Sequence, residues 1–304
     1  MNKIKSKYGQ GIIYALISYF SWGMFPLFWK MLSSIPALNV LAHRMLWSCF
    51  FLLLVALISK SKKIILYISQ PKLFIRLGLA GCIIALNWGV YIYAVETNHI
   101  VEASLGYYIN PLFNVLLGVF FLKEKLSRSQ QLAVLSAFIG VGYITFDYGK
   151  LPWISIVLAL SFSFYGLLKK KVNLDSMPAL TVETLVVMPF ALGFLFYSGA
   201  SDNYPFFPSS IFLTLLLIFG GVITIAPLYW FGKAAQKIPL STLGFIQYVT
   251  PTIQLLIGVF LYNEQFTKAH LVCFCFVWTG LFIYTISLVN KTIKNYKKAQ
   301  SVQM

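Results

Sequence analysis

The sequence is poor in charge, and above all in negative charge. Of its 304 residues only 11% are charged and only eight are Asp or Glu, whereas 59% are apolar. A soluble domain carries about 25% charged residues, because charges cover its water-facing surface. So few charges exclude a soluble globular protein and a disordered chain. The composition therefore predicts an all-α integral membrane protein.

Cysteine and the common catalytic motifs are also scarce. The four cysteines are too few for a disulfide scaffold, and Cys273 and Cys275 would point to opposite sides of one helix, so we expect no metal site. The sequence has no phosphate-binding loop of the form Gly-x-x-x-x-Gly-Lys-Ser/Thr, no His-Glu-x-x-His and no Gly-x-Ser-x-Gly. We expect neither a cofactor nor an enzymatic activity.

Positive charge is plentiful, but its distribution does not fit nucleic-acid binding. The formal net charge is +16. The Lys and Arg residues fall in short clusters between apolar segments, as loop charges do, and form no recurrent basic face. The expected macromolecular surroundings are a lipid bilayer, and nucleic acid is excluded as a partner.

Ten segments are long and apolar enough to cross a membrane. A spanning helix needs about 20 mostly apolar residues. The predicted segments are 10–30, 37–59, 73–95, 102–122, 130–147, 152–169, 179–198, 210–232, 239–262 and 270–290. Lys and Arg gather at alternate segment ends, with Lys30, Lys150 and Lys268 as exceptions and Arg44 inside a segment. Because positive loops stay in the cytoplasm, both termini are predicted to be cytoplasmic.

The two halves of the chain resemble each other. When residue n is compared with residue n + 140, the segments YINPLFNVLLGVFFLKE (108–124) and YVTPTIQLLIGVFLYNE (248–264) share Tyr, Pro, Leu, Gly, Val, Phe and Glu without a gap. The same offset aligns Gly81 with Gly221 and Gly140 with Gly280, and an offset of 142 aligns 36–40 with 178–182. The sequence thus predicts repeats at 1–148 and 149–290, followed by a basic cytoplasmic tail at 291–304.

An odd number of helices per repeat gives the two repeats opposite orientations. Five spans in each half would leave Glu124 in the cytoplasm and Glu264 outside, in agreement with the loop charges. Inverted-topology repeats are a recurrent transporter design, in which the substrate site lies between the halves near the membrane midplane. The predicted fold class is therefore ten transmembrane helices in two inverted-topology five-helix repeats.

Several short strings in these segments are similar to a known family. They are SWG at 21–23, LAHR at 41–44, WS at 47–48, NW at 87–88 and LGYYINP at 105–111, and each fourth helix ends in Gly-Val-Phe-x-x-x-Glu. On these strings the chain resembles the EamA repeats of the drug/metabolite transporter superfamily, and within it the RarD-type permeases. The resemblance implies a multi-pass permease of the bacterial inner membrane that carries a metabolite or a drug-like molecule.

A polar stripe in each repeat gives the first candidate site. Tyr107, Asn110 and Asn114 share one face of a helix, and Gln247 and Gln254 lie at the matching positions of the second repeat. Amides in hydrocarbon are costly unless they are hydrogen-bonded. Two interpretations stay open: the stripes line a central substrate cavity, or they bond neighbouring helices to each other. Trp88, beside the stripe by analogy with the family, is expected to pack against substrate.

Each stripe also contains a proline. Pro111 and Pro251 each remove a backbone hydrogen bond in the middle of a span and should kink the helix. These kinks are candidate hinges for a transport cycle, or they only shape the bundle.

Arg44 has the highest free energy of membrane insertion of any residue in the sequence, since an arginine in mid-membrane costs about 2.5–3.5 kcal/mol to insert. It could bind an anionic group of the substrate, lock a gate, or bond helix-end carbonyls. Glu183 is the obvious counter-charge, although the helix rise leaves about 10 Å of vertical separation between the two. Glu183 and His43 are also candidates for proton coupling, with purely structural roles as the alternative.

Together these features predict a secondary transporter that moves a small molecule by alternating access between the two repeats. The main rival is a membrane scaffold or sensor whose polar stripes only hold helices together. The sequence leaves open the substrate, the coupling ion and the choice between a monomer and a homodimer.

Overall fold

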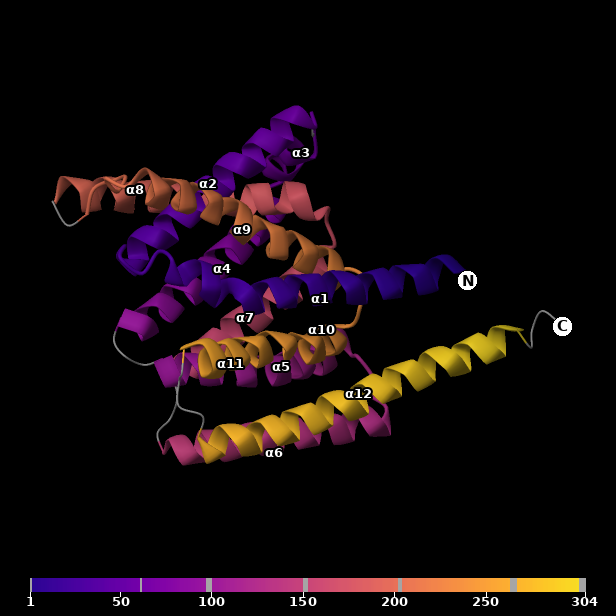
Figure 1. The fold of residues 1–304 in the computed structure, drawn as a ribbon. Coiled ribbons are helices and arrows are strands. Elements are labelled where there is room, and N and C mark those ends of the chain that lie inside the picture. The colour runs from indigo at the N-terminus through magenta and orange to yellow at the C-terminus, as the bar shows by residue number, and fades with distance from the viewer. Residues whose placement is uncertain are drawn as a thin grey trace.

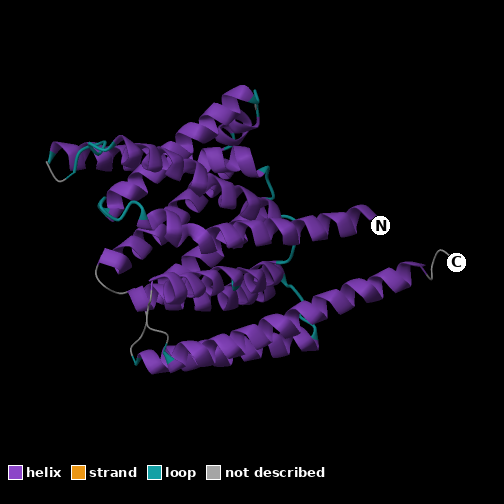
Figure 2. Cartoon of the chain, viewed as in Figure 1, coloured by secondary structure: helices purple, strands orange, loops and turns teal. Residues whose placement is uncertain are grey.

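The computed structural model describes residues 2–60, 62–96, 100–149, 153–201, 204–262 and 267–300. Every regular element in these ranges is a helix (Figure 2). The helices are α1 (Asn2–Lys30), α2 (Ala37–Ile58), α3 (Lys63–Ser69), α4 (Pro71–Glu96), α5 (Ile100–Leu122), α6 (Arg128–Tyr148), α7 (Trp153–Val172), α8 (Ser176–Ala200), α9 (Ile211–Ala235), α10 (Leu240–Gln247), α11 (Val249–Tyr262) and α12 (Lys268–Gln300).

Ten spans are confirmed in the described part of the chain, and they coincide with the predicted segments. Two details differ from the expectation. The short helix α3 lies between the second and third spans, and the ninth span consists of α10 and α11, which together cover Leu240–Tyr262. The predicted tail is not a separate unit, because residues 291–300 continue α12.

Both termini lie at the same end of the bundle (Figure 1). The lysines that end α7, Lys169 to Lys171, lie in the last turn of a helix that runs toward this end, and Lys123 follows the last residue of α5 there. We call it the basic end, and the other the opposite end. Lys63 of α3 pairs at this end with Asp175, which raises the pKa of the Lys63 ammonium.

Most packing occurs between the repeats rather than within them. The first helix of each repeat packs on the third and fourth helices of the other: α1 contacts α9, α10 and α11, and α7 contacts α4 and α5. The second helix of each repeat also packs on the third helix of the other, α2 on α9 and α8 on α4. Matching helices pack on each other as well, α2 with α8, α5 with α10 and α6 with α12, and Figure 1 shows the last pair along one edge of the bundle. This pattern is that of two halves related by a two-fold axis.

The two-fold relation extends to individual hydrogen bonds. The amide of Asn110 donates to the backbone oxygen of Ala159 over 2.6 Å, and the hydroxyl of Thr250 donates to the backbone oxygen of Tyr19 over 2.7 Å. The donors are 140 residues apart, and so are the acceptors. An offset found in the sequence is therefore an equivalence in space.

Glycines at the α6–α12 crossing follow the same two-fold relation between the repeats. A Cβ atom on Gly140 would lie 2.9 Å from the backbone oxygen of Cys273, and one on Gly280 would lie 2.7 Å from that of Ala133. Both pairs again match at an offset of 140. Each glycine lets the backbone of the partner helix approach more closely than any side chain would allow.

The two halves nevertheless differ around their prolines. The helix α5 continues through Pro111, whereas the ninth span is interrupted at Tyr248 and Pro251 lies in the first turn of α11. Proline fits a first turn, because its missing N–H has no helical partner there. The two spans therefore differ in continuity, since the described part of the chain has a break near Pro251 and none at Pro111. The role of both prolines as hinges stays a prediction.

The apolar core is also distributed unevenly. The largest buried cluster includes Tyr165 and Leu167 near the end of α7, Phe231 near the end of α9 and Leu240 at the start of α10, all toward the basic end. A second large cluster follows α5, α6 and α12, and smaller clusters lie at both ends, one at the opposite end with Leu32 and Leu217 and one at the basic end with Tyr67 and Leu77. The predicted external residue Glu264 lies outside the described residues.

Candidate functional site

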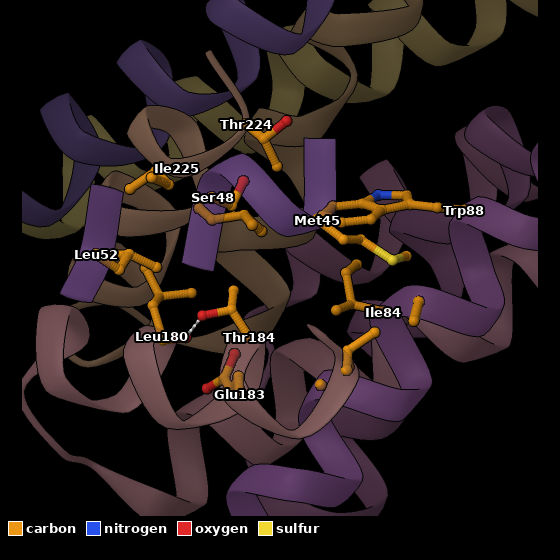
Figure 3. Close-up of a pocket in the computed structure, with 14 residues that line it drawn as sticks. Met45, Ser48, Leu52, Ile84, Trp88, Leu180, Glu183, Thr184, Thr224 and Ile225 are labelled. Carbon is orange, nitrogen blue, oxygen red and sulfur yellow. Dashed lines mark hydrogen bonds between the residues drawn. The ribbon is translucent and has the colours of Figure 1, made fainter. Parts of the chain in front are cut away.

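A small cavity of about 30 Å³ lies where the second and third helices of both repeats meet. Its walls come from α2, α4, α8 and α9, and Figure 3 shows their side chains converging on it. Most of the lining is apolar, with Met45, Leu52, Ile84 and Ile225 among it. The polar lining residues are Ser48, Trp88, Glu183, Thr184 and Thr224. Such a mostly apolar hollow with a few polar groups is the usual form of a small-molecule site.

Two repeat-equivalent glycines position the cavity walls. A Cβ atom on Gly81 of α4 would lie 2.5 Å from the backbone oxygen of Glu183 in α8, and one on Gly221 of α9 would lie 2.6 Å from the backbone carbon of Trp47 in α2. Both crossings are close backbone contacts. The helices therefore meet beside the cavity at fixed points, and side chains on either side of the crossings line it.

Arg44 lies next to this cavity in an aromatic cage. Its guanidinium carbon is 4.0 Å from the ring centre of Trp88 and 4.8 Å from that of Trp29, and its Nε donates to the hydroxyl of Thr224 over 3.2 Å. Trp88 and Thr224 also line the cavity. A cation over desolvated indole faces gains about 1–2 kcal/mol per contact. The cage thereby offsets part of the cost of an arginine in a membrane span.

The electrostatic neighbours of Arg44 are two tyrosines, Tyr91 and Tyr107, whose ring centres lie 6.0 Å apart. Among the side chains that the structure describes, which do not include those of Glu96 and Glu102, no carboxylate lies at ion-pair distance from Arg44. Glu183, the obvious counter-charge in the sequence, does not pair with Arg44. The vertical separation foreseen from the helix rise is the reason, since Glu183 lies deeper toward the basic end and has a nearer partner there.

That partner is Lys169 of α7. Its ammonium donates to Glu183 Oε1 over 2.7 Å, and the hydroxyl of Tyr165 donates to Oε2 over 3.1 Å. Both charged side chains are almost wholly buried, with 5% of Lys169 and 3% of Glu183 exposed. The sequence places Lys169 among the loop lysines of the basic end, but its side chain points inward. A buried charge pair of this kind holds α7 against α8.

The same carboxylate separates two cavities. Glu183 lines the central cavity and also a smaller one of about 10 Å³ on the side of the basic end. Arg76, Lys169 and Gln236 contribute the other polar side chains of the smaller cavity. The ion pair thus lies in the wall between the central cavity and a polar recess beside it.

The polar stripe of the first repeat forms a buried hydrogen-bond network. Asn114 donates to Gln247 over 2.8 Å and to Asn110 over 3.1 Å, and Asn110 donates to Ser163 over 3.2 Å. The network joins α5 to α7 and α10, and its members do not line the central cavity. In this conformation the amides bond helices to each other, which is the structural alternative; their role toward a substrate stays a prediction.

The remaining candidates are dispersed. Gln254 donates to the backbone oxygen of Trp22 in α1 over 3.2 Å, while Tyr107 lies near Arg44. His43 is buried at the opposite end, where its Nε2 lies 2.7 Å from the backbone oxygen of Phe206 in the segment between α8 and α9. Its place against that segment favours a structural role over a proton relay.

The structure adds three residues that sequence analysis did not single out for the site: Trp29, Thr224 and Lys169. Trp29 and Thr224 are distant in sequence from Arg44, so no local pattern links them. Lys169 carried a local signal, because Tyr165 and Lys169 are four residues apart on one helix face and the next helix contains a single acidic residue.

The comparisons with known proteins agree with this architecture. Residues 9–146 and 151–286 each match the model of the EamA-like transporter family. A protein of Bacillus subtilis (strain 168) named "Uncharacterized transporter YojE" is 44% identical over 92% of this chain and 95% of its own length. "Protein RarD" of Escherichia coli (strain K12) is 38% identical over 92% of this chain and 95% of its own.

A more distant relative is "Chloramphenicol-sensitive protein RarD" of Pseudomonas aeruginosa, 27% identical over 90% of this chain and 93% of its own length. A solved crystal structure superposes with a TM-score of 0.69 at 15% identity and covers 90% of this chain and 98% of its own. At that identity the structural likeness concerns the fold alone.

Proposed function

Because the chain belongs to the EamA-like transporter family and is related to RarD proteins, we propose that it is a secondary transporter that moves a small molecule across the bacterial inner membrane by alternating access. The observation that carries the proposal is the unequal packing around the central cavity. The fourth helices of the two repeats are sealed at the basic end, where α5 packs on α10, and make few contacts at the opposite end, where α5 faces α11.

The seal at the basic end is built from close contacts. A Cβ atom on Gly244 of α10 would lie 2.7 Å from the Cβ of Asn114, and Asn114 and Gln247 are hydrogen-bonded across the same interface. The largest apolar cluster lies at this end as well. With both termini in the cytoplasm, as the charge distribution predicts, this conformation is closed toward the cytoplasm.

The two-fold relation supports a specific second state. The repeat equivalents of Asn114 and Gln247 are Gln254 and Tyr107, which now bind Trp22 and neighbour Arg44. If the repeats exchange conformations, Gln254 moves to Tyr107 and seals the opposite end. Asn114 then takes the present place of Gln254 and bonds the backbone oxygen of Phe162, the equivalent of Trp22. The cavity would open toward the cytoplasm.

Glu183 is the candidate coupling residue in this scheme. It lies between the central cavity and the polar recess, so a rearrangement of α8 against α7 would break its pair with Lys169 and expose the carboxylate to water and protons. Since one partner of a buried pair left alone is strongly unfavourable, proton uptake and rearrangement would be linked.

Transport can be tested with a broad mixture of candidate substrates. Proteoliposomes that contain the purified protein are incubated with a ¹³C-labelled bacterial metabolite extract, and their contents are compared with those of empty liposomes by mass spectrometry. We expect at least one labelled compound to enter only with the protein present. The scaffold alternative predicts identical contents.

A matched pair of variants links transport to the seal. Asn114→Leu removes its hydrogen bonds at the basic end, and such bonds in membranes average about 0.6 kcal/mol, which is about a threefold change in a two-state equilibrium. Thr279→Val makes a comparable polar-to-apolar change on the exposed surface of α12. We expect the first to change the transport rate at least about threefold and the second to leave it unchanged.

A further inference from the structure

No ion pair of Arg44 is found among the side chains that the structure describes. Its Nε donates to Thr224, and its guanidinium lies against the rings of Trp29 and Trp88. The acidic residues that form ion pairs in the described ranges are engaged elsewhere, Glu183 with Lys169 and Asp175 with Lys63. The positive charge in this span is therefore balanced by nothing that the described residues provide.

The architecture itself does not need this charge. At the offset of 142 that aligns the second helices of the repeats, the equivalent of Arg44 is Val186. The second repeat thus builds the same helix in the same kind of packing with an apolar residue. An arginine that costs about 2.5–3.5 kcal/mol to insert, and that the fold can replace by valine, is better explained by a ligand.

The cage leaves one direction free for that ligand. The two indoles lie over the guanidinium at 4.0 and 4.8 Å, and Thr224 accepts the hydrogen bond from Nε. No hydrogen bond of the two terminal nitrogens is found among the described side chains, and Tyr91 and Tyr107 are the electrostatic neighbours of the guanidinium. The edge formed by the two terminal nitrogens is the one that binds a carboxylate in a planar, bidentate manner, with two parallel N–H···O bonds.

The single charge of Arg44 and the lining of the adjoining cavity restrict the chemical class of the ligand further. One guanidinium balances one negative charge, which fits a carboxylate better than a phosphate monoester with about two charges at neutral pH. The neighbouring cation Lys30 is directed at the ring of Tyr262, with its ammonium 5.4 Å from the ring centre. The adjacent cavity is lined mainly by apolar side chains, which suit a hydrocarbon or aromatic body.

We propose that Arg44 binds the carboxylate of the transported molecule, and that the substrates are monocarboxylates with an apolar body. The proposal rests on the proposed transport function and adds the chemical class of the substrate. Trp88 and Thr224 belong to both the cage and the cavity wall. They connect the anion position to the space that would take the rest of the molecule.

Binding of three matched probes tests the proposal. The full-length protein in lipid nanodiscs is titrated with 3-phenylpropionate, with its neutral amide and with phenyl phosphate, and thermal stability is followed at each concentration. We expect 3-phenylpropionate to raise the melting temperature, because a ligand that binds only the folded state stabilises it. The amide and the phosphate should have little effect.

Three variants assign the effect to the guanidinium. Arg44→Gln should weaken the apparent affinity for 3-phenylpropionate at least about tenfold, because hydrogen bonds to charged groups contribute well over the energy of a tenfold change. Arg44→Lys keeps the charge but loses the bidentate edge, so its affinity for 3-phenylpropionate should lie between those of Arg44→Gln and the unmodified protein. Arg128→Gln, at an exposed arginine at the start of α6, is the matched control and should bind normally.

The outcomes separate this inference from the transport proposal. Equal stabilisation by the amide, a preference for phenyl phosphate, the absence of any carboxylate effect, or unchanged affinity in a folded Arg44→Gln would overturn the monocarboxylate site. Transport of only neutral or cationic compounds in the proteoliposome experiment would do the same while leaving the transport proposal intact. Carboxylate binding without transport of any compound would remove the proposed function and leave the binding site.

Discussion

At the scale of single residues, the spans of this protein handle buried charge in two different arrangements. Lys169 and Glu183 neutralise each other over 2.7 Å, whereas Arg44 lies between aromatic rings. The cost of a buried charge is the same physical quantity in both cases. In the Lys169–Glu183 pair the two side chains offset this cost within the protein. The aromatic cage of Arg44 offsets only a part of the cost, and a bound ligand would offset the rest.

The buried pair gives a prediction about stability. Lys169→Met leaves the carboxylate of Glu183 with only the hydroxyl of Tyr165, so it should reduce the free energy of unfolding by about 3–5 kcal/mol. The double variant Lys169→Met with Glu183→Leu should regain most of this loss, because neither charge then remains. Thermal melts in detergent compare the three proteins. A double variant as unstable as the single one would show that the pair is not a closed electrostatic unit.

The double variant also tests the coupling role of Glu183. In proteoliposomes with an imposed pH gradient, it should fold and still carry substrate down its own gradient, but no longer respond to the pH gradient. An unchanged response would assign Glu183 to structure alone.

Sequence analysis could identify Arg44 and Glu183, because a charge in an apolar segment is visible without coordinates. It could not supply their partners. Trp29, Trp88 and Thr224 come from three other helices, and their approach to Arg44 depends on how the two repeats are packed. Glu183 pairs with Lys169 instead, because this α7 lysine, which the sequence assigns to a loop, points into the bundle.

At the scale of the helices, close crossings depend on individual glycines. On α6, a Cβ at Gly140 would lie 2.7 Å from the Cβ of Phe276, whereas one at Gly142 would meet nothing within 4 Å. Gly140→Leu should therefore destabilise the protein by about 1–3 kcal/mol through overpacking. Gly142→Leu should be neutral or slightly stabilising, since leucine favours a helix. Unfolding titrations of both variants compare the same substitution in the same helix; equal effects would contradict the crossing.

A second helix-scale prediction concerns Glu124, the glutamate that follows α5 in the repeat motif. Its carboxylate accepts hydrogen bonds from the backbone N–H of Leu240 over 2.7 Å and of Ser241 over 3.0 Å, and from the Ser241 hydroxyl over 2.7 Å. It thus caps the N-terminus of α10, where a negative charge is favourable.

Removal of this cap should loosen the seal at the basic end. We expect Glu124→Ala to reduce stability by about 1–2 kcal/mol and to increase the labelling of a cysteine placed at Thr242, a buried position of α10. Lys125→Ala, at the exposed neighbouring position, is the control. Unchanged labelling in Glu124→Ala would show that the cap does not hold α10 in place.

Helix positions were well predicted from hydropathy, because ten apolar segments with short connections leave little freedom. The interruption of the ninth span could not be predicted from hydropathy. Pro111 and Pro251 have the same sequence context, so the sequence predicts the same kink for both, yet only the second lies next to a break. The difference arises from the conformation that each repeat adopts, and a repeat motif cannot encode two conformations separately.

At the scale of the whole molecule, the repeat could be predicted and the asymmetry could not. An offset of 140 residues reappears as matched hydrogen bonds and matched glycine contacts. What distinguishes the two ends of the cavity is a difference between equivalent contacts: Asn114 bonds Gln247, whereas Gln254 bonds Trp22. That difference is what a transporter would need in order to have a closed and an open side.

The central claim is that the two repeats exchange these contacts, and disulfide trapping tests it most directly. After replacement of the four native cysteines, one protein carries Asn114→Cys with Gln247→Cys and another carries Tyr107→Cys with Gln254→Cys. Each is oxidised in membranes and assayed for transport before and after reduction. The account predicts that both pairs cross-link, that each cross-link stops transport and that reduction restores it. Failure of the Tyr107–Gln254 pair to cross-link in a protein that transports, or continued transport with either pair locked, would contradict it.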